Sequence, residues 1–311
     1  MIYCCGEALI DMIPLSTPEG TTFLPVGGGA AWNAAVALGR LGARAGLVAG
    51  LSRDAFGQRL AADVEAAGVD TRQSPRFDRP TAIALVTLSA TGVPEFSIRD
   101  EGSAGRLLTE ADLPKTLPGA EAAIFGGISL VAEPSGGAFE ALYARLPPRV
   151  VRVLDPNIRP QFIAEAGALR ARLAQMLPGA HIVKLSAEDL DWLTDRPEHY
   201  IASLLDAGTL MVCETLGEKG MRLHRRGERF SLPARRVTLA DTVGAGDTFN
   251  AGLLAALQRA GALSPAALAE IRRDGLERAL RFALDAAALS VTRKGANPPT
   301  RAEVEATRWD G

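Results

Sequence analysis

Short apolar runs alternate with longer helical patterns along most of this 311-residue chain. Such runs suit strands that are buried on both faces, and a helix between two strands lets them pair in parallel. The pattern therefore predicts a doubly wound α/β fold, with helices on both faces of a mainly parallel sheet. The predicted strands are Ile2–Cys5, Ala45–Ala49, Ala122–Phe125, Val150–Leu154, Ile182–Leu185 and Leu210–Cys213.

Segments between these runs are long enough for packing helices, and two alanine-rich helical patterns occupy the last third of the chain. No low-complexity linker and no internal repeat interrupts the pattern. We expect a single domain over residues 1–311, since this length suits one large α/β domain with a small appendage. The predicted helices are Ala31–Leu41, Ala55–Ala67, Ser135–Leu146, Leu169–Leu177, Ala245–Ala260 and Leu276–Val291.

Two segments, Ile13–Pro25 and Ala82–Arg99, do not follow this strand–helix pattern. Their apolar and polar residues alternate with a period closer to two residues. Alternation of that kind is typical of half-buried strands. We therefore expect extra strands outside the main sheet. The pattern alone allows two interpretations, which are a pair of surface hairpins or a small β-sheet lid over a cleft.

Composition narrows the class of partner. The chain is 47% hydrophobic and 23% charged, as expected of a globular protein with a sizeable core. Its formal charge of −2 gives no overall attraction to nucleic acid or to an anionic membrane, so small molecules are the expected partners. Three cysteines without a CxxC pair favour a reducing, cytoplasmic location. Glu7 and Asp11 interrupt the first apolar stretch, which therefore predicts neither a signal peptide nor a membrane span.

Several common site motifs are absent from the sequence. None of the four lysines completes a P-loop, and Gly244–Phe249 has phenylalanine where a dinucleotide-binding loop has its third glycine. The three histidines, His181, His199 and His224, do not have the spacing of a zinc site.

The strongest local signal is Asp241–Gly252, in which two glycines precede Asp247 at the start of a long apolar helix. Glycine lets the backbone approach a ligand, and consecutive N–H groups at a helix start attract an anion. This segment is expected to cradle a phosphoryl group while Asp247 accepts the proton of an attacking hydroxyl. The competing interpretation is a turn followed by a capping aspartate. A carboxylate at a helix start is expected to keep a low pKa, which phosphoryl transfer tolerates because it depends mostly on positioning.

A second glycine cluster, Gly27–Gly29, lies near the other end of the chain and leads into an apolar helix that carries Asn33. We expect Asp11 at the C-terminal edge of the first strand, where doubly wound sheets bind ligands. A carboxylate and an amide suit vicinal hydroxyls, because one accepts hydrogen bonds and the other both donates and accepts them. Taken singly, these residues fit turn and cap roles equally well.

Together the two segments resemble the signatures of the ribokinase-like, PfkB-type carbohydrate kinase family, an N-terminal GG…N and a C-terminal DTxGAGD. The resemblance covers nearly the whole chain. It implies a ribokinase-like fold and ATP-dependent transfer of the γ-phosphoryl group to a sugar hydroxyl. The implied site consists of Asp247 as the catalytic base, Gly244, Ala245 and Gly246 as the anion hole, and Asp11, Gly28, Gly29 and Asn33 as the sugar-binding residues.

Two further segments are similar to landmarks of the family. Asp155–Arg159 resembles its DxNxR segment, and Thr215–Gly220 resembles its TLGxxG turn. The implied contacts are Arg159 with the substrate or the transferring phosphates, and Thr215, Gly217 and Gly220 with the phosphates of the nucleotide.

A third segment, Lys184–Leu190, aligns with the NxxE stretch of the family, which organises magnesium and phosphate through water. Ser186 and Asp189 stand here in place of Asn and Glu. The resemblance implies that Lys184 and Ser186 bind the nucleotide and that Asp189 holds hydrated Mg²⁺, an ion that prefers oxygen ligands and keeps several of its waters.

The family often carries a monovalent cation such as K⁺ beside the anion hole, held mostly by backbone carbonyls. The resemblance also implies that segments 13–25 and 82–99 form a β-lid, which shields the sugar and pairs with a partner's lid in a homodimer. Closure of a lid would expel water from the site. The matching cation positions are Asp241, Val243, Ser290, Arg293 and Gly295.

The sequence is compatible with several acceptor sugars. The sequence of Gly6–Asp11 is similar to the corresponding segment of bacterial fructokinases. This similarity favours D-fructose as the acceptor, with phosphorylation of its primary hydroxyl. A 2-keto-3-deoxygluconate kinase would use a cation such as Arg99 or Arg106 for the carboxylate. A ribokinase is a further alternative, and so is a nucleoside kinase that uses Phe96 or Trp32 for a base. A catalytically inactive sugar-sensing protein is the alternative outside the enzymes.

Overall fold

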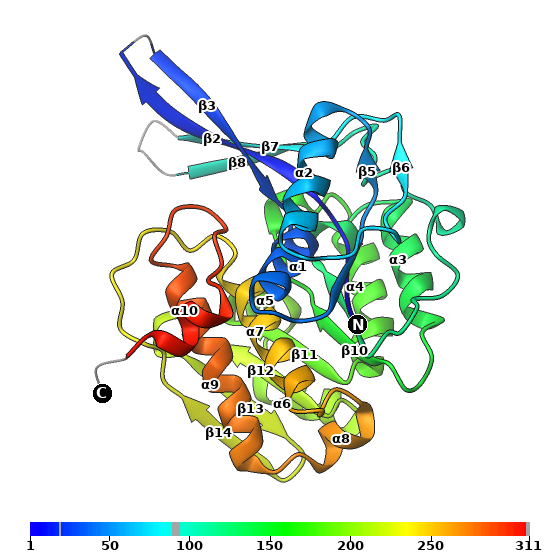
Figure 1. Ribbon diagram of the computed structural model, residues 1–311. Helices are drawn as coiled ribbons and strands as arrows, with labels where there is room; N and C mark the ends of the chain where they lie inside the picture. The colour runs from blue at the N-terminus through cyan, green and yellow to red at the C-terminus, as the bar shows by residue number, and fades with distance from the viewer. Residues whose placement is uncertain (19, 89–93, 309–311) are drawn as a thin grey trace.

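The computed structural model describes the backbone of residues 1–18, 20–88 and 94–308 and the side chains of these residues other than 86–88 and 94–96. Within these ranges, eight strands form the main sheet in the order β14-β13-β12-β11-β10-β9-β1-β4 (Figure 1). The strands from β12 to β4 run parallel, as predicted. The bounds are β1 (Ile2–Cys5), β4 (Ala45–Val48), β9 (Ala122–Gly126), β10 (Val151–Asp155), β11 (Ile182–Ser186), β12 (Met211–Thr215), β13 (Met221–Arg225) and β14 (Glu228–Leu232).

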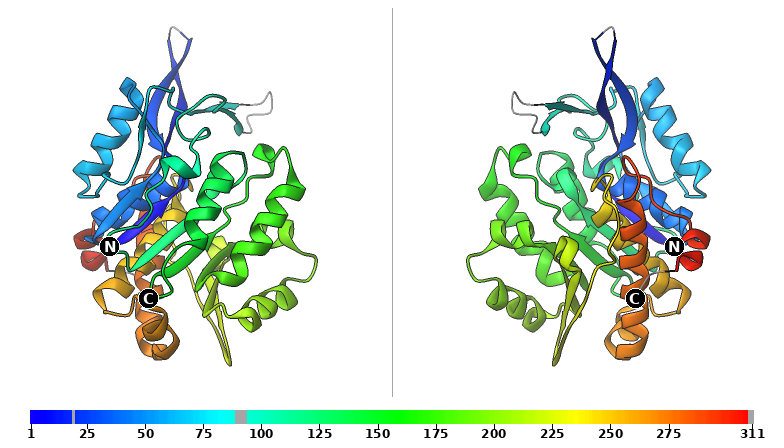
Figure 2. Two further views of the ribbon diagram at one scale, coloured as in Figure 1. Left: turned by 90° about the vertical axis from the view of Figure 1, so that its right-hand side faces the viewer. Right: turned by 90° about the vertical axis from the view of Figure 1, so that its left-hand side faces the viewer.

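Helices cover both faces of this sheet (Figure 2). One face packs against α1, α2 and α7–α10, and the other packs against α3–α6. Small residues let α7 and α9 approach closely, since a Cβ on Gly252 would lie 2.8 Å from the Cα of Ala283. The helices are α1 (Ala30–Arg40), α2 (Ala55–Ala66), α3 (Ser135–Ala144), α4 (Ala166–Met176), α5 (Ala187–Leu193), α6 (Pro197–Ala207), α7 (Ala245–Arg259), α8 (Pro265–Glu270), α9 (Arg273–Ser290) and α10 (Arg301–Ala306).

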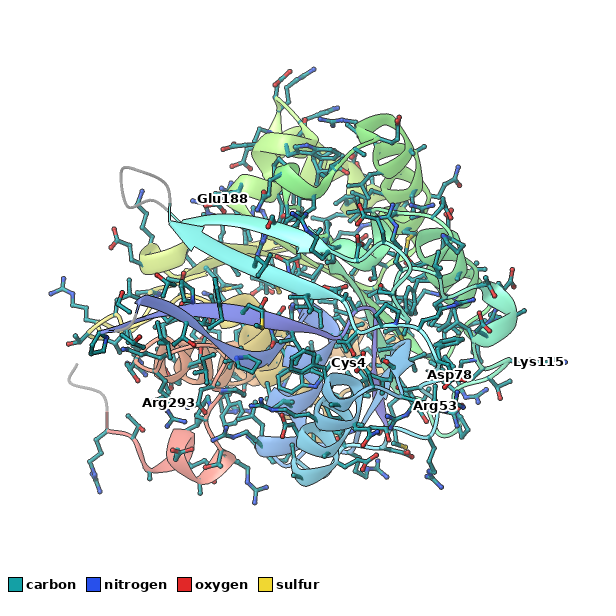
Figure 3. The ribbon with its side chains drawn as sticks, turned by 90° about the horizontal axis from the view of Figure 1, so that it is seen from above. Cys4, Arg53, Asp78, Lys115, Glu188 and Arg293 are labelled. Carbon is teal, nitrogen blue, oxygen red and sulfur yellow. The ribbon has the colours of Figure 1, made fainter. Side chains whose placement is uncertain are left out.

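A second sheet lies outside the main one, in the order β3-β2-β7-β8 within the described ranges. The prediction of extra strands in the two alternating segments is thereby confirmed, although β2 and β3 extend beyond Ile13–Pro25 at both ends. Figure 3 shows the two hairpins side by side from above, with the Arg53–Asp78 ion pair (3.3 Å) near the short β5–β6 pair. These strands are β2 (Leu9–Thr17), β3 (Gly20–Gly28), β5 (Leu51–Ser52), β6 (Arg76–Phe77), β7 (Ile83–Leu88) and β8 (Pro94–Arg99).

The antiparallel hairpin β13–β14 extends the main sheet and was not predicted. Its apolar residues alternate with charged ones, because an edge hairpin faces solvent more than a central strand does. Helices α5, α6, α8 and α10 also escaped prediction, since they are short or largely polar. In the described ranges no helix is both long enough and apolar enough to cross a membrane.

Candidate active site

The loop between β3 and α1 requires glycine at successive positions. A Cβ on Gly28 would lie 2.2 Å from Oδ2 of Asp11, and a Cβ on Gly29 would lie 2.7 Å from the carbonyl oxygen of Glu7. Gly29 also has a φ of 98°, in the region that disfavours side chains. The loop is therefore built so that the backbone passes close to the Asp11 carboxylate.

Glu7 holds this loop in place and was missed as a site residue. Its Oε1 accepts the N–H of Ala30 at 2.9 Å, and its Oε2 accepts the N–H of Ser129 at 3.0 Å. One carboxylate thus links the start of α1 to the loop that follows β9. The sequence signal for it was the position of Glu7 two residues after the end of β1, at the ligand-binding edge of the sheet.

Asp11 lies in β2 of the small sheet, and not at the edge of the first strand of the main sheet as expected. It is half-buried, and burial raises its pKa to about 6. Among the described residues, no donor forms a hydrogen bond with its carboxylate. This leaves its oxygens available to hydroxyl groups of a ligand.

The start of α7 has the form expected of an anion hole. Gly244 has a φ of 75° and precedes Ala245, the first residue of the helix. The N–H of Ala245 bonds to the carbonyl of Thr242 at 3.2 Å, whereas those of Gly246 and Asp247 meet no acceptor in the described part of the chain. These N–H groups and the positive end of the helix dipole favour an anion.

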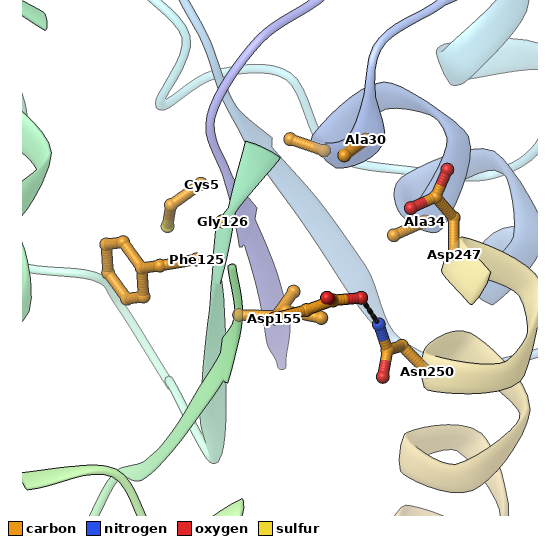
Figure 4. A pocket seen from close by; sticks show the side chains of 10 residues that line it. Cys5, Ala30, Ala34, Phe125, Gly126, Asp155, Asp247 and Asn250 are labelled. Carbon is orange, nitrogen blue, oxygen red and sulfur yellow. Dashed lines mark hydrogen bonds between the residues drawn. The ribbon is translucent and has the colours of Figure 1, made fainter. Parts of the chain in front are cut away.

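The two signature segments meet directly. Nδ2 of Asn33 on α1 donates a hydrogen bond to Oδ2 of Asp247 on α7, at 2.9 Å, across 214 positions of sequence. The amide oxygen of the same side chain, Oδ1 of Asn33, is buried without a partner among the described residues. A hollow of about 20 Å³, enough for one water molecule, lies between the starts of α1 and α7 and the ends of β1, β9 and β10 (Figure 4).

Burial raises the pKa of Asp247 to about 7. The hydrogen bond from Asn33 lowers the pKa, but burial outweighs it, and the negative charge of Asp155 acts in the same direction as burial. The expectation of a low pKa at this helix start is therefore wrong, because the side chain is only 7% exposed and loses more hydration than the helix dipole returns. A carboxylate with this pKa is suited to accept a proton near neutral pH.

A buried ion pair lies under the start of α7. Nζ of Lys184 on β11 lies 3.2 Å from Oδ2 of Asp155, which also accepts the Nδ2 N–H of Asn250 at 2.7 Å. A Cβ on Gly246 would lie 3.2 Å from the same Nζ, so the ammonium group lies beside the anion hole. Burial alone would lower the pKa of Lys184, but the negative charges of Asp155, Asp189 and Asp247 raise it, which keeps the ammonium charged.

Ser186 and Asp189 bind each other at the start of α5. Oδ2 of Asp189 accepts the backbone and hydroxyl hydrogens of Ser186, both at 2.8 Å, and its Oδ1 accepts the N–H of Ile158 at 2.7 Å. The Asp189 side chain is 1% exposed. This arrangement does not fit a ligand of hydrated magnesium, and no group of three or more His, Cys, Asp or Glu in the described ranges is placed to hold a metal.

The other expected nucleotide residues lie along the same edge of the sheet. Arg159 is exposed in the loop after β10. Thr215 ends β12, and Gly217 and Gly220 have positive φ in the tight turn between β12 and β13. A Cβ on Gly220 would lie 2.1 Å from the carbonyl oxygen of Leu232, so only glycine fits there.

The structure brings the five expected cation positions into one loop cluster. The Asp241 carboxylate accepts the N–H of Gly295 at 2.9 Å and that of Val243 at 3.0 Å. The N–H of Arg293 bonds to the carbonyl of Ser290 at 3.1 Å. The two loops that would share a cation are thus held together next to the anion hole.

Several residues that the alternative substrates would require form other contacts in the structure. Arg106 pairs with Asp100 at 3.0 Å, and Arg99 is exposed and bonds the neighbouring carbonyl of Ile98. Trp32 is buried and donates to the carbonyl of Leu60 at 3.0 Å. The side chain of Phe96 lies outside the described residues.

Comparison with known proteins decides the family. The profile described as pfkB family carbohydrate kinase matches residues 1–303. The chain belongs to this family. Among the relatives of this pfkB family kinase, the fructokinase of Rhizobium leguminosarum bv. trifolii is 42% identical over 279 residues, which are 89% of this chain and 85% of that protein.

Solved structures agree with the assignment. The fructokinase of Xylella fastidiosa with bound ATP has a TM-score of 0.89 at 29% identity, over 98% of this pfkB family kinase and 96% of that chain. The fructokinase of Vibrio cholerae O395 in its fructose, ADP and calcium bound form has a TM-score of 0.83 at 27% identity, over 98% and 97%. The predicted ribokinase-like fold and carbohydrate kinase class are confirmed.

Proposed function

We propose that this chain is an ATP-dependent fructokinase that transfers the γ-phosphoryl group of ATP to the primary 6-hydroxyl of D-fructose. The observation that carries the proposal is the Asn33–Asp247 hydrogen bond, because it joins the candidate sugar loop to the candidate anion hole. A relative named fructokinase at 42% identity, and a solved fructokinase with fructose and ADP, support fructose as the acceptor.

In this mechanism the sugar-binding residues present the primary hydroxyl to Asp247. Asp247 accepts the hydroxyl proton while the oxygen attacks the γ-phosphorus, the bond from that phosphorus to the β–γ bridging oxygen breaks, and ADP leaves. Peptide N–H groups at the start of α7 stabilise the charge on the transferring group. The sugar is held by Asp11, Asn33 and the backbone of Gly28 and Gly29.

The nucleotide lies along the carboxyl ends of β10–β12. Lys184 contributes a buried positive charge beside the anion hole, and Arg159 supplies an exposed one. The turn with Thr215, Gly217 and Gly220 receives the phosphates, and Ser186 borders it. Mg²⁺ bound to ATP supplies charge neutralisation on the phosphates, and K⁺ is proposed between the loops of Asp241–Val243 and Ser290–Gly295.

The small sheet acts as a lid over the sugar in this proposal. Closing it would exclude water from the phosphoryl group and so limit hydrolysis of ATP. Its exposed apolar residues, Leu15, Phe23 and Leu24, support a homodimer in which two lids pack together.

A substrate panel with an Asp247→Ala variant tests the function. With ATP, the wild-type protein is expected to phosphorylate fructose faster than 2-keto-3-deoxygluconate, ribose or adenosine. Loss of the base should reduce turnover of fructose by about 10²- to 10⁴-fold, while calorimetry still detects fructose binding. Asp274→Ala is the matched control, because Asp274 is an aspartate in the first turn of α9 and forms an ion pair with Arg278.

Two results would contradict the proposal. Turnover of Asp247→Ala close to wild type would make Asp247 a helix cap. Fructose binding without phosphorylation by the wild-type chain would instead favour the sugar-sensing alternative.

A further inference from the structure

Asp155 and Asn250 connect the first turns of α7 to the main sheet. Nδ2 of Asn250 donates to Oδ2 of Asp155 at 2.7 Å, and both side chains are buried. We propose that Asp155 and Asn250 are positioning residues for phosphoryl transfer, because their hydrogen bond fixes the direction in which Asp247 points. The inference rests on the proposed role of Asp247 as the base.

The spacing on α7 makes this coupling direct. Asn250 follows Asp247 by three residues, so the two side chains lie on the same face of the helix, one turn apart. Figure 4 shows Asp155 and Asn250 pointing toward one another, with Asp247 one turn further toward the start of the helix. A rotation of α7 that moved Asp247 away from the acceptor hydroxyl would also break the Asn250 bond.

Asp155 is a rigid anchor for the helix. It ends β10, which lies between β9 and β11 inside the sheet. Its Oδ1 accepts the N–H of Asn157 at 3.1 Å, and its Oδ2 lies 3.2 Å from the Lys184 ammonium. With a side chain fixed from three directions, Asp155 transmits the position of the sheet to α7.

Stability alone is a weak reason for this network. A buried ion pair contributes little net stability compared with apolar residues of the same volume. Helix α7 already buries an apolar surface that includes Leu253, Leu254 and Leu257 in the core shared with α1 and α9. Apolar packing tolerates small rotations, whereas a hydrogen bond specifies direction. What the polar contact adds is therefore orientation.

A second contact makes orientation matter. Asn33 on α1 already donates a hydrogen bond to Oδ2 of Asp247, so the position of the carboxylate depends on how α1 and α7 lie against each other. Only if α7 keeps its rotation does Oδ1 of Asp247 remain directed at the acceptor hydroxyl. Misplacement of a reacting group by about 1 Å can cost on the order of 10²-fold in rate.

The test compares Asn250→Ala in the wild-type and Asp247→Asn backgrounds. In the wild-type background we expect kcat with fructose and ATP to fall about 10- to 100-fold, with both KM values within about twofold, since substrate contacts are untouched. In the Asp247→Asn background the same substitution should change the residual kcat by less than about twofold, because there is no base left to orient.

Gln258→Ala is the matched control on the same helix. Nε2 of Gln258 donates to a carboxylate oxygen of Glu121 at 2.7 Å, so the variant loses the same kind of bond at the far end of α7. Its kcat should equal that of the wild type. If Asn250→Ala does not fold, as judged by thermal unfolding, Asn250→Ser fills more of the space and still cannot reach Asp155.

Three results separate the outcomes. A kcat of the position-250 variant equal to wild type would overturn the inference. An equal fold-loss in both backgrounds would overturn it too, because the residue would then act independently of Asp247. Full activity of Asp247→Asn alone would refute the proposed base, and with it the inference, whatever Asn250→Ala does.

Discussion

The charge on Asp247 is set by neighbours that act in opposite directions. Burial raises its pKa to about 7, the hydrogen bond from Asn33 lowers it, the negative charges of Asp155 and Glu7 raise it, and the Lys184 ammonium lowers it. Burial raises the pKa of the Cys4 thiol on β1, and the negative charge of Asp247 raises it further. The Asp247 carboxyl is thus half ionised near neutral pH, and small changes around it should move the pH at which the proposed base can accept a proton.

The pH dependence of kcat/KM for fructose should report the pKa of Asp247. Activity should fall as the pH drops below about 7, because protonated Asp247 cannot accept a proton. In Asn33→Leu the acid limb should move to higher pH, since the lost hydrogen bond favoured the ionised form. In Asp155→Asn it should move to lower pH, since a negative charge next to the base is removed.

The measurement is the position of the acid limb and not the height of the profile, since Asn33 is also proposed to bind the sugar. Shifts of the two variants in the same direction, or an acid limb near pH 4 in the wild type, would contradict the electrostatic account.

At the scale of elements, the site depends on turns that no side chain can enter. Gly28 and Gly29 at the start of α1, and Gly244 at the start of α7, are fixed by close contacts or positive φ. These glycines let two helix starts face the same space from different parts of the sheet. Their role is steric, so adding one methyl group should have a local effect.

Gly28→Ala should raise KM for fructose about 10-fold or more, while KM for ATP changes little, because the new Cβ would collide with the Asp11 carboxylate. Steady-state kinetics with each substrate varied in turn measures the difference. Gly167→Ala on α4 is the matched control, since a Cβ there meets nothing within 4 Å. That variant should keep its kinetics and gain about 0.5–1 kcal/mol of stability. Equal effects on both KM values would argue against a specific contact with the sugar loop.

The parallel strands could be predicted from the sequence because strands buried on both faces leave continuous apolar runs. The bounds of β1 were predicted to the residue, and those of β9 and β10 to within one. The hairpin β13–β14 could not be predicted from the sequence, because Arg222, Arg225 and Arg229 interrupt its apolar pattern. A strand of this kind is stabilised by pairing with a neighbouring strand, and the residues of that neighbour are not part of the local sequence pattern.

Candidate site residues that belong to a local motif could be proposed from the sequence, and those that depend on tertiary contacts could not. Asp247 and Asn33 belong to glycine-marked segments, but nothing in either segment indicates the bond between them. The raised pKa of Asp247 depends on burial by distant elements, which overrides the local helix-start rule. Glu7 and Asn250 act by holding backbone or helix position, and each reads as an ordinary polar residue in the sequence.

At the scale of the whole molecule, the small sheet carries most of the large apolar side chains that are exposed in the described ranges. Leu15, Phe23 and Leu24 lie on the β2–β3 hairpin and are 38–47% exposed. Leu15 and Leu24 share one face of the hairpin, and Phe23 lies on the other. Exposed apolar side chains of this kind favour association with another apolar surface. In Figure 1 the hairpin extends away from the main sheet, where a second copy can reach it.

Leu24→Glu should therefore convert the proposed dimer to a monomer of 32.7 kDa, because it places a charge in the apolar contact. Light scattering coupled to size-exclusion chromatography measures the change. Leu239→Glu is the control, since Leu239 is 62% exposed but lies outside the small sheet. A wild-type protein that elutes as a monomer at all concentrations would refute the dimer.

The bond that joins α1 to α7 also has a consequence for biosynthesis. A chain that has emerged from the ribosome only as far as β12 has the proposed sugar loop, but it has neither the proposed base nor the N–H groups at the start of α7. The proposed mechanism therefore predicts that partial translation products do not transfer phosphate. The site is completed only when the last quarter of the polypeptide, which contains α7, packs against α1.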